Sequence, residues 1–196
     1  MSILALTSDT LIGTAAAGNI EYNGQFFGTD SNASRAQLQR IVRATAVAST
    51  SGTAIDFTNI PAWVERITVM FNETSLSNTD NLLIRLGTGS TTYTTSGYAS
   101  TSNLYSNGST TSGVSSTTGV ILSLGSTAAS TATGMLVLAN ISGDTWVSSH
   151  THKVGTTTAG SGGGVVTLGA VLTAVRITST GTATFDNGSV NIIYEG

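Results

Sequence analysis

The sequence predicts an all-β fold: an antiparallel β-sandwich of jelly-roll type, preceded by a short mixed N-terminal segment. Charged residues make up only 9 % of the 196-residue chain, against about 25 % in an average soluble domain. Ser, Thr and Gly are abundant, and short aliphatic runs alternate with turn residues at intervals of roughly 8–12 residues. No long helical pattern stands between these runs, which argues against a parallel α/β enzyme fold.

The chain divides by composition into two regions. Residues 1–48 hold three of the seven basic residues, and we expect them to form an N-terminal attachment or trimerisation segment. Small residues between positions 44 and 53 predict a linker. Residues 53–196 are then expected to form a single sandwich head, within the usual length of about 100–200 residues for one domain.

The N-terminal segment carries two local signals. Asn23-Gly24, flanked by apolar and aromatic residues, is a strong signal for a β-hairpin because both residues tolerate the backbone of a tight turn. Further along, Asn32 or Ser34 is placed to cap a helix over residues 35–43. The segment is therefore predicted to mix strand and helix.

The head contains a series of predicted strands. Their apolar runs lie at 66–71, 82–86, 120–124, 135–139, 165–168, 171–178 and 190–194. Of these, 135–139 is apolar enough to predict a strand buried on both faces. The polar stretch 90–118 is too long for a structureless loop, so it predicts edge strands joined by exposed loops. The glycine run 160–164 reads as a flexible connection between strands.

Aromatic residues are the candidate contact residues of the head. Tyr93, Tyr98 and Tyr105 are spaced through a stretch of Ser, Thr, Gly and Asn, the composition of recognition loops, where tyrosine supplies rigid contact area. A solvated edge with a few anchoring tyrosines has the same composition. Trp146 is suited either to stacking on a sugar ring or to filling the core.

Several stretches together resemble a β-sandwich head module of bacteriophage tail fibres and related virion proteins. They are residues 56–71 (DFTNIPAWVERITVMF), residues 84–98, which include LGTGSTTYTTSGY, and the C-terminal residues 175–195. The N-terminal stretch NIEYNGQFFGTD, residues 19–30, is similar to segments that join stems to heads in phage fibres. The chain is short for a long fibre and lacks an extended repeat shaft.

The resemblance implies a homotrimeric protein on the virion surface, made in the bacterial host cytoplasm and not an enzyme. It implies a receptor-binding fibre that contacts host cell-surface glycans through Ser, Thr and Asn hydrogen bonds and tyrosine stacking. The alternative is a capsid decoration or head-fibre protein that stabilises the shell without touching the host. In either case we expect the N-terminal segment to bind another virion protein, with Tyr22, Phe26, Phe27 and Arg35 as candidate contacts.

His150 and His152 are the only histidines. Their spacing places both imidazoles on one face of a strand, and imidazole suits iron, nickel and zinc. Because some phage fibre tips hold iron through such pairs, the resemblance implies a transition metal shared by three copies on the trimer axis. The alternative is an exposed turn with solvated histidines, and no other cofactor is expected.

Other functional classes find no support in the sequence. The net charge of −3 and the absence of a basic stripe argue against nucleic acid, and no run of 18 apolar residues predicts a membrane span. Glu73 and Asp80 sit in a polar stretch, and Asp144 and Asp186 stand beside turn glycines, so no carboxylate pair indicates a glycosidase. The glycine run 160–164 lacks the Lys-Ser/Thr that follows in a phosphate loop.

Overall fold

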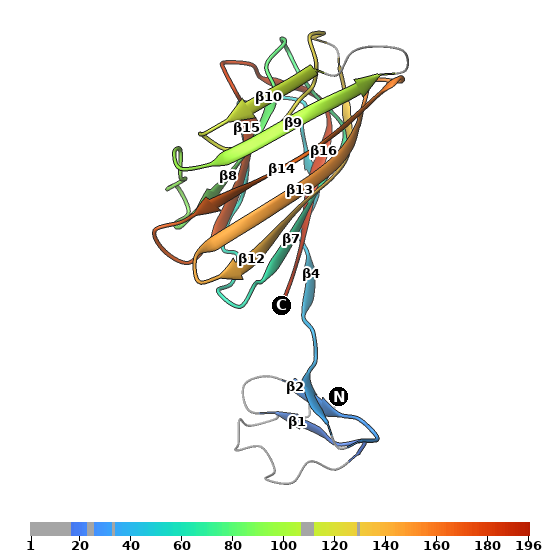
Figure 1. Ribbon diagram of the computed structural model, residues 1–196, viewed down its shortest axis with the longest axis vertical. Coiled ribbons are helices and arrows are strands. Elements are labelled where there is room, and N and C mark those ends of the chain that lie inside the picture. Colours follow the sequence, from blue (N-terminus) through green and yellow to red (C-terminus); the bar gives the residue numbers. More distant parts are fainter. Residues whose placement is uncertain (1–16, 23–25, 33, 107–111, 129) are drawn as a thin grey trace, which may run out of the picture. The chain divides into compact units, whose positions relative to one another are not determined.

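The computed structural model describes residues 17–22, 26–32, 34–106, 112–128 and 130–196. All regular elements within these residues are β-strands (Figure 1), which confirms the predicted all-β class. The described residues contain no helix long and apolar enough to cross a membrane. The chain divides into two compact units, Met1–Arg40 and Ile41–Gly196.

The N-terminal unit contains a small antiparallel sheet. Its strands β1 (Ile20–Tyr22), β2 (Phe26–Thr29) and β3 (Arg35–Gln37) pair in that order. The predicted hairpin is confirmed by the pairing of β1 with β2, although its turn, Asn23-Gly24, lies outside the described residues.

The predicted helix over residues 35–43 is wrong. The Asp30 carboxylate accepts hydrogen bonds from the backbone N–H groups of Asn32 and Ser34, both at 2.9 Å. These bonds close a turn that returns β3 alongside β2. The polar residues expected to cap a helix therefore serve a turn, and strand pairing overrides the weak local preference.

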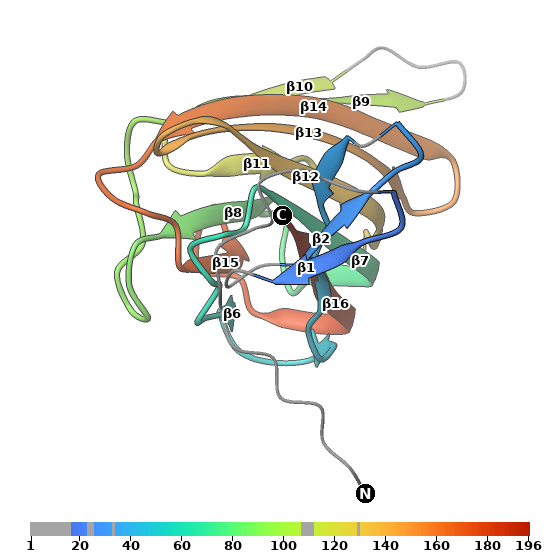
Figure 2. The same ribbon diagram turned by 90° about the horizontal axis from the view of Figure 1, so that it is seen from below.

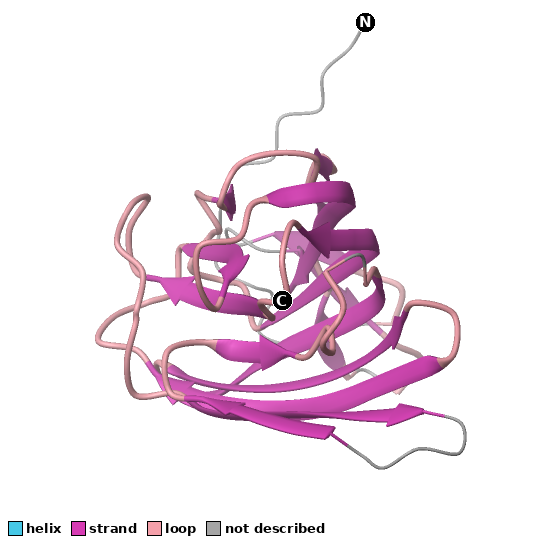
Figure 3. Ribbon diagram, turned by 90° about the horizontal axis from the view of Figure 1, so that it is seen from above, coloured by secondary structure: helices cyan, strands magenta, loops and turns pink. Residues whose placement is uncertain are grey.

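The head consists of two antiparallel sheets that face each other (Figures 2 and 3). The larger sheet holds, in spatial order, β10 (Ser112–Ser116), β9 (Ala99–Ser106), β14 (Thr158–Thr167), β13 (Thr145–Val154), β12 (Ala132–Ser142), β7 (Arg66–Leu76), β16 (Phe185–Glu195) and β4 (Ile41–Arg43), with β5 (Val47–Ala48) also paired to β16. The smaller sheet holds β11 (Val120–Leu122), β8 (Leu82–Gly87), β15 (Ala174–Ser179) and β6 (Ala54–Phe57).

The path of the chain between these sheets is that of a jelly roll. From β4 in the larger sheet the chain passes to β6 in the smaller sheet, returns to β7 in the larger sheet and crosses to β8 in the smaller sheet. The second half starts in the smaller sheet with β11 and alternates again through β12, β15 and β16. These eight strands form two four-stranded layers, β4-β16-β7-β12 and β6-β15-β8-β11, the double-sheet arrangement of jelly rolls. The remaining head strands are two hairpins, β9–β10 and β13–β14, which extend the larger sheet.

The core lies between the two layers. Alternate residues of β7, such as Ile67, Val69 and Phe71, are buried, because successive side chains in a strand point to opposite faces. The smaller sheet contributes a more continuous apolar surface through β8, β11 and β15. The same alternation contradicts the prediction that residues 135–139 are buried on both faces, since Met135 is 56 % exposed.

Two other segments differ from their predictions. Residues 44–49, expected in a linker, belong to the head: the Ala44 N–H donates to the Ile192 carbonyl at 3.0 Å and the Ser49 N–H to the Gly188 carbonyl at 2.9 Å. The division between the two units thus falls after Arg40. By contrast, the stretch 90–118 does contain the expected edge strand, since β10 is outermost in the larger sheet.

Candidate ligand-binding site

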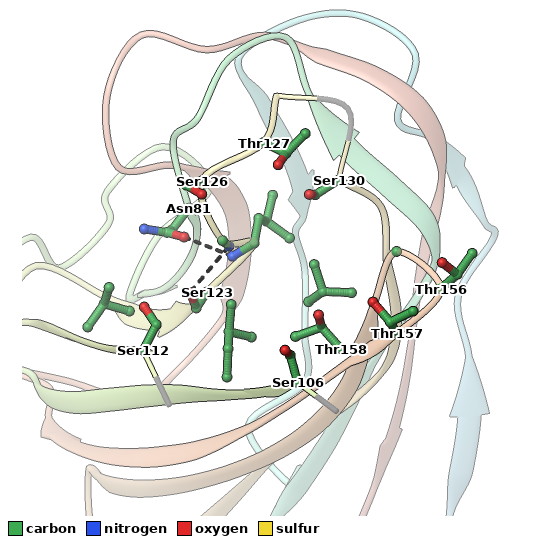
Figure 4. Close-up of a pocket in the computed structure, with 16 residues that line it drawn as sticks. Asn81, Ser106, Ser112, Ser123, Ser126, Thr127, Ser130, Thr156, Thr157 and Thr158 are labelled. Carbon is green, nitrogen blue, oxygen red and sulfur yellow. Dashed lines mark hydrogen bonds between the residues drawn. The ribbon is translucent and has the colours of Figure 1, made fainter. Parts of the chain in front are cut away.

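A pocket of ≈ 600 Å³ lies at one end of the head (Figure 4). One wall comes from β9 and β10, and another comes from the segment between β11 and β12. The end of β13 and the turn into β14 complete the lining, together with Asn81 from the start of β8. Strands from both sheets thus hold short loops around one opening.

The lining is dominated by hydroxyl groups. Nine of its sixteen residues are serine or threonine: Ser106, Ser112, Ser123, Ser126, Thr127, Ser130, Thr156, Thr157 and Thr158. Figure 4 shows them on several sides of the opening. The apolar part comes from Leu104, Val114, Leu124 and Val154, and none of the described lining residues carries a charge. Since each hydroxyl both donates and accepts hydrogen bonds, the pocket matches an uncharged ligand with hydroxyl groups.

Asn81 anchors one wall of the pocket. Its side-chain carbonyl accepts a hydrogen bond from the Leu124 N–H at 2.8 Å. Its backbone bonds in both directions with Thr180: the Asn81 N–H donates to Oγ1 at 3.0 Å, and the Thr180 N–H donates to the Asn81 carbonyl at 2.9 Å. The segment after β11 is therefore tied to the loop between β15 and β16.

Buried serines of β9 hold the other edge of β11. The Ser100 hydroxyl accepts a hydrogen bond from the Ile121 N–H at 3.0 Å, and the Ser102 hydroxyl accepts one from the Ser123 N–H at 3.1 Å. Both serines are less than 5 % exposed. Since β11 pairs with only one strand, β8, these side chains satisfy backbone donors that would otherwise be buried without a partner.

The two histidines lie directly behind this wall. His152 Nε2 donates to the Ser123 carbonyl at 2.8 Å, and His150 Nε2 lies 3.1 Å from the Ser102 hydroxyl. Their exposed fractions are 4 % for His150 and 2 % for His152. Burial lowers the pKa of His150 to about 4, with a smaller effect from His152, and burial also lowers the pKa of His152. Both rings are therefore neutral at neutral pH.

The glycine run makes room for these rings. Gly160 and Gly162 lie opposite His152 and His150 on the neighbouring strand. A Cβ at Gly160 would lie 2.6 Å from His152 Nε2, and one at Gly162 would lie 2.6 Å from His150 Cε1. Residues 160–164 are thus part of β14 rather than the flexible connection that was predicted.

The arrangement of the histidines differs from both predictions. Their shared strand face is confirmed, but that face is the interior of the chain's own sandwich, with ring centroids 5.4 Å apart. The predicted axial metal needs rings that face outward toward other copies, and the predicted turn needs solvated rings. Within the described residues no group of three His, Cys, Asp or Glu is placed to hold a metal ion.

The predicted receptor-contact residues separate into buried and exposed positions. Tyr98 and Trp146 are each 3 % exposed, so they are core residues and offer no surface to a receptor. The Tyr98 hydroxyl accepts the Leu86 N–H at 2.8 Å, and burial raises its pKa to about 12. Tyr93 is half-buried with the Arg176 guanidinium 4.1 Å from its ring centroid.

Tyr105 is the one predicted contact residue with a largely exposed side chain, at 47 %. Its neighbours Leu104 and Ser106 line the pocket, so Tyr105 points to the opposite face of β9. The structure therefore does not place the predicted tyrosines around the pocket. Sequence reasoning missed the lining serines and threonines because hydroxyl residues occur throughout the chain and nothing local distinguishes these.

The candidate virion-attachment residues lie together in the N-terminal unit. The rings of Tyr22 and Phe26 have centroids 5.0 Å apart, and Phe26 is 44 % exposed. Phe27 is half-buried in β2, and Arg35 begins β3 opposite Thr29. The small sheet thus pairs Tyr22 with Phe26 and places Arg35 at the other end of β2, opposite Thr29.

The lining of the pocket supplies hydrogen-bonding and apolar groups. The lining residues that the structure describes include no histidine, carboxylate, lysine or tyrosine, the side chains that act as general acids and bases. Hydrogen bonding from hydroxyls and packing against a few aliphatic side chains are what it offers. No protein-family model, curated protein or solved structure matches this chain.

Proposed function

We propose that this chain is a bacteriophage virion protein whose jelly-roll head binds a neutral glycan of the host surface in the hydroxyl-lined pocket. The observation that carries the proposal is the lining itself: nine hydroxyl residues and no charge around ≈ 600 Å³. That volume falls in the range of about 300–1,000 Å³ usual for small-molecule sites. A sugar meets hydroxyl partners there, whereas a charged ligand meets no opposite charge to offset its lost hydration.

The virion location follows from the sequence resemblance over residues 56–71, 84–98 and 175–195. The separate N-terminal unit supports a division of labour, in which Tyr22, Phe26, Phe27 and Arg35 attach the chain to another virion protein. We place the protein on the virion surface as a homotrimer. Three pockets on one particle component multiply weak single-site binding through effective concentration.

The outward face of the larger sheet supports self-association. Two cross-strand rows on this face, Ile193–Thr68–Val137–Ser149–Gly163 and Asn191–Met70–Met135–Thr151–Ser161, contain no charged residue. Ion pairs flank the rows, Arg66–Glu195 at 3.1 Å and Lys153–Glu73 at 3.2 Å. In a trimer, residues that lie on the three-fold axis meet their own copies, and an uncharged face avoids like-charge repulsion there.

A glycan-binding measurement tests the proposed function. The intact protein is presented to neutral and acidic host-surface oligosaccharides, together with Thr157→Trp, which fills the pocket, and Thr95→Trp, a matched change at an exposed threonine outside it. We expect neutral glycans to bind the wild type and Thr95→Trp, and Thr157→Trp to lose at least about tenfold in affinity, or about 1.4 kcal/mol.

Binding of acidic glycans alone, or unchanged binding by Thr157→Trp, would contradict the proposed pocket. If no glycan binds and the protein instead raises the thermal stability of purified capsids, the alternative role in capsid decoration is correct.

A further inference from the structure

We propose that His152 positions the pocket wall formed by residues 123–125, and that protonation of the His150–His152 pair releases this wall and empties the pocket. The identity of the ligand rests on the function proposed above, whereas the positioning itself does not. The proposal is argued from the hydrogen bonds of Ser123, from the environment of the two rings, and from what a proton would do there.

Ser123 depends on side chains rather than on a strand ladder. Strand β11 ends at Leu122, and Ser123 follows it as a 1 % exposed residue that also lines the pocket. Its N–H donates to the Ser102 hydroxyl, and its carbonyl accepts from His152 Nε2. The next residue, Leu124, is held by Asn81. The wall is therefore held by Asn81 on one side and by Ser102 of β9 and His152 of β13 on the other.

The hydrogen bond to the Ser123 carbonyl defines the tautomer of the neutral His152 ring. Only an N–H can donate to the Ser123 carbonyl, so the neutral ring carries its proton on Nε2 and leaves a lone pair on Nδ1. The Nδ1 atoms of both histidines are buried, and neither has a hydrogen-bond partner among the described residues. A second proton would therefore arrive at an atom with no acceptor nearby.

Burial of the pair disfavours a positive charge, and this outweighs the hydrogen bond to the Ser123 carbonyl, which by itself raises the pKa of His152. His150 and His152 face each other on β13, Ser102 contributes a hydroxyl from β9, and Ser123 contributes its backbone from β11. From β14, Gly160 lies against the His152 ring and Gly162 against the His150 ring. The one titratable group that acts on His150 is His152, and its charge disfavours protonation further. Protonation is thus coupled to exposure of the rings.

Exposure of the rings disrupts the wall because the two share hydrogen bonds. Moving His152 toward water breaks its bond to the Ser123 carbonyl, and moving His150 removes the partner of the Ser102 hydroxyl that holds the Ser123 N–H. The sign follows from the lowered pKa values: the closed wall is fully favoured above about pH 6.5, the ordinary value for histidine, and is progressively lost toward the pKa of about 4 of His150.

Residue-resolved amide hydrogen exchange tests the positioning without any ligand. After correction for intrinsic rates, we expect the Ser123 and Leu124 amides of the wild type to lose protection below pH 6.5, by about tenfold per pH unit for each proton taken up. Amides paired between β7 and β16 serve as internal controls and should keep their protection. In His152→Gln, which retains an N–H donor but leaves only His150 to titrate, the loss of protection at Ser123 and Leu124 should be no steeper than about tenfold per pH unit, and therefore less steep than in the wild type.

The proposal is overturned if wild-type protection at Ser123 and Leu124 is independent of pH, if the β7–β16 amides open with them, or if His152→Gln behaves as wild type. Nitrogen chemical shifts of the wild-type imidazoles provide a check that needs no variant: they should report the Nε2-protonated form of His152 at neutral pH. Glycan affinity measured in parallel should decrease as the pH is lowered in the wild type, and should decrease less steeply in His152→Gln. A pH-dependent wall with no glycan bound would refute the proposed function and leave the positioning role intact.

Discussion

Gly162 lies opposite His150 on the neighbouring strand, and a Cβ there would also collide with the backbone carbonyl of Thr101. Lack of space for a side chain therefore explains this glycine. Its backbone conformation does not, since the φ of Gly162 lies outside the left-handed region. The same reasoning applies to Gly160 beneath His152. At these positions the absence of a side chain allows a buried histidine ring to pack against the neighbouring strand.

Replacing this glycine should therefore destabilise the head. We expect Gly162→Ala to lower the free energy of unfolding by about 1–3 kcal/mol, the usual cost of overpacking, as measured by urea denaturation. Gly169→Ala is the matched control, since a Cβ at Gly169 meets nothing within 4 Å. Equal stability of the two variants would show that the histidine ring moves aside without cost.

Glu73 is a second residue whose role depends on its neighbours. It has a positive φ of 50° within β7, where the pairing of β12 with β7 shifts register. Its carboxylate accepts hydrogen bonds from Thr131 at 2.6 Å, Thr133 at 2.8 Å and Lys153 at 3.2 Å. These bonds, those of the threonines first, lower the pKa of Glu73 to about 2.

The lowered pKa predicts a pH-dependent contribution to stability. Because the folded state favours the carboxylate, this contribution is fully present above the ordinary value of 4.5 and is lost as the pH falls toward about 2. We expect Glu73→Gln to be less stable than wild type in thermal unfolding at pH 7, with the difference shrinking at pH 2–3. A difference that stays constant across this range would assign the effect to packing instead.

At the scale of elements, β9 does more than extend the larger sheet. Its inward serines, Ser100 and Ser102, bond to the free edge of β11 in the other sheet. Two layers are thereby joined through side chains at an edge where strand pairing ends. The alternation of serine along β9 is visible in the sequence, but its partner could not be predicted because β11 belongs to the opposite layer.

Loss of one of these hydroxyls leaves a buried backbone donor without a partner. Ser102→Ala should therefore cost about 1–3 kcal/mol in unfolding free energy and increase hydrogen exchange at the Ser123 amide. Thr101→Ala, on the exposed face of the same strand, is the control and should change both measurements little. If Ser102→Ala matched this control, water would be an adequate substitute for the hydroxyl.

Predictions of elements from the sequence are correct where hydrophobic periodicity is strong. They are wrong where pairing with residues distant in the chain determines the secondary structure. The alternation of Ile67, Val69 and Phe71 predicts β7, and the apolar run at 82–86 predicts β8, as the structure confirms. Residues 35–43 follow the cap-like residues Asn32 and Ser34, yet residues 35–37 and 41–43 pair with other strands. Glycine weakens strands locally, so the sequence predicts a connection at 160–164, whereas the neighbouring histidine rings explain Gly160 and Gly162 in β14.

At the scale of the whole molecule, the proposed trimer is the broadest expectation. We expect the uncharged rows around Met70 and Met135 to be covered in the trimer. Sedimentation equilibrium of the intact wild type should therefore give a mass of three times 19.8 kDa. Met135→Lys introduces a charge at a 56 % exposed position and should yield folded monomers with unchanged circular dichroism. Thr95→Lys, outside this face, should remain trimeric.

A stable, well-folded wild-type monomer would refute the trimer, and a trimer that tolerates Met135→Lys would place the interface elsewhere. The glycan-binding measurement with Thr157→Trp tests the pocket separately from either result.

The sequence by itself determined the all-β class and the position of most head strands, because the alternation of apolar and polar residues and the turn residues depend only on neighbouring positions in the chain. The tertiary structure alone decided which hydroxyls surround the pocket, which tyrosines are buried, and that both histidines face inward. Those outcomes depend on contacts between residues far apart in the chain, such as His152 with Ser123 and Asn81 with Leu124. In a chain so rich in serine and threonine, a functional hydroxyl differs from any other only by where the fold places it.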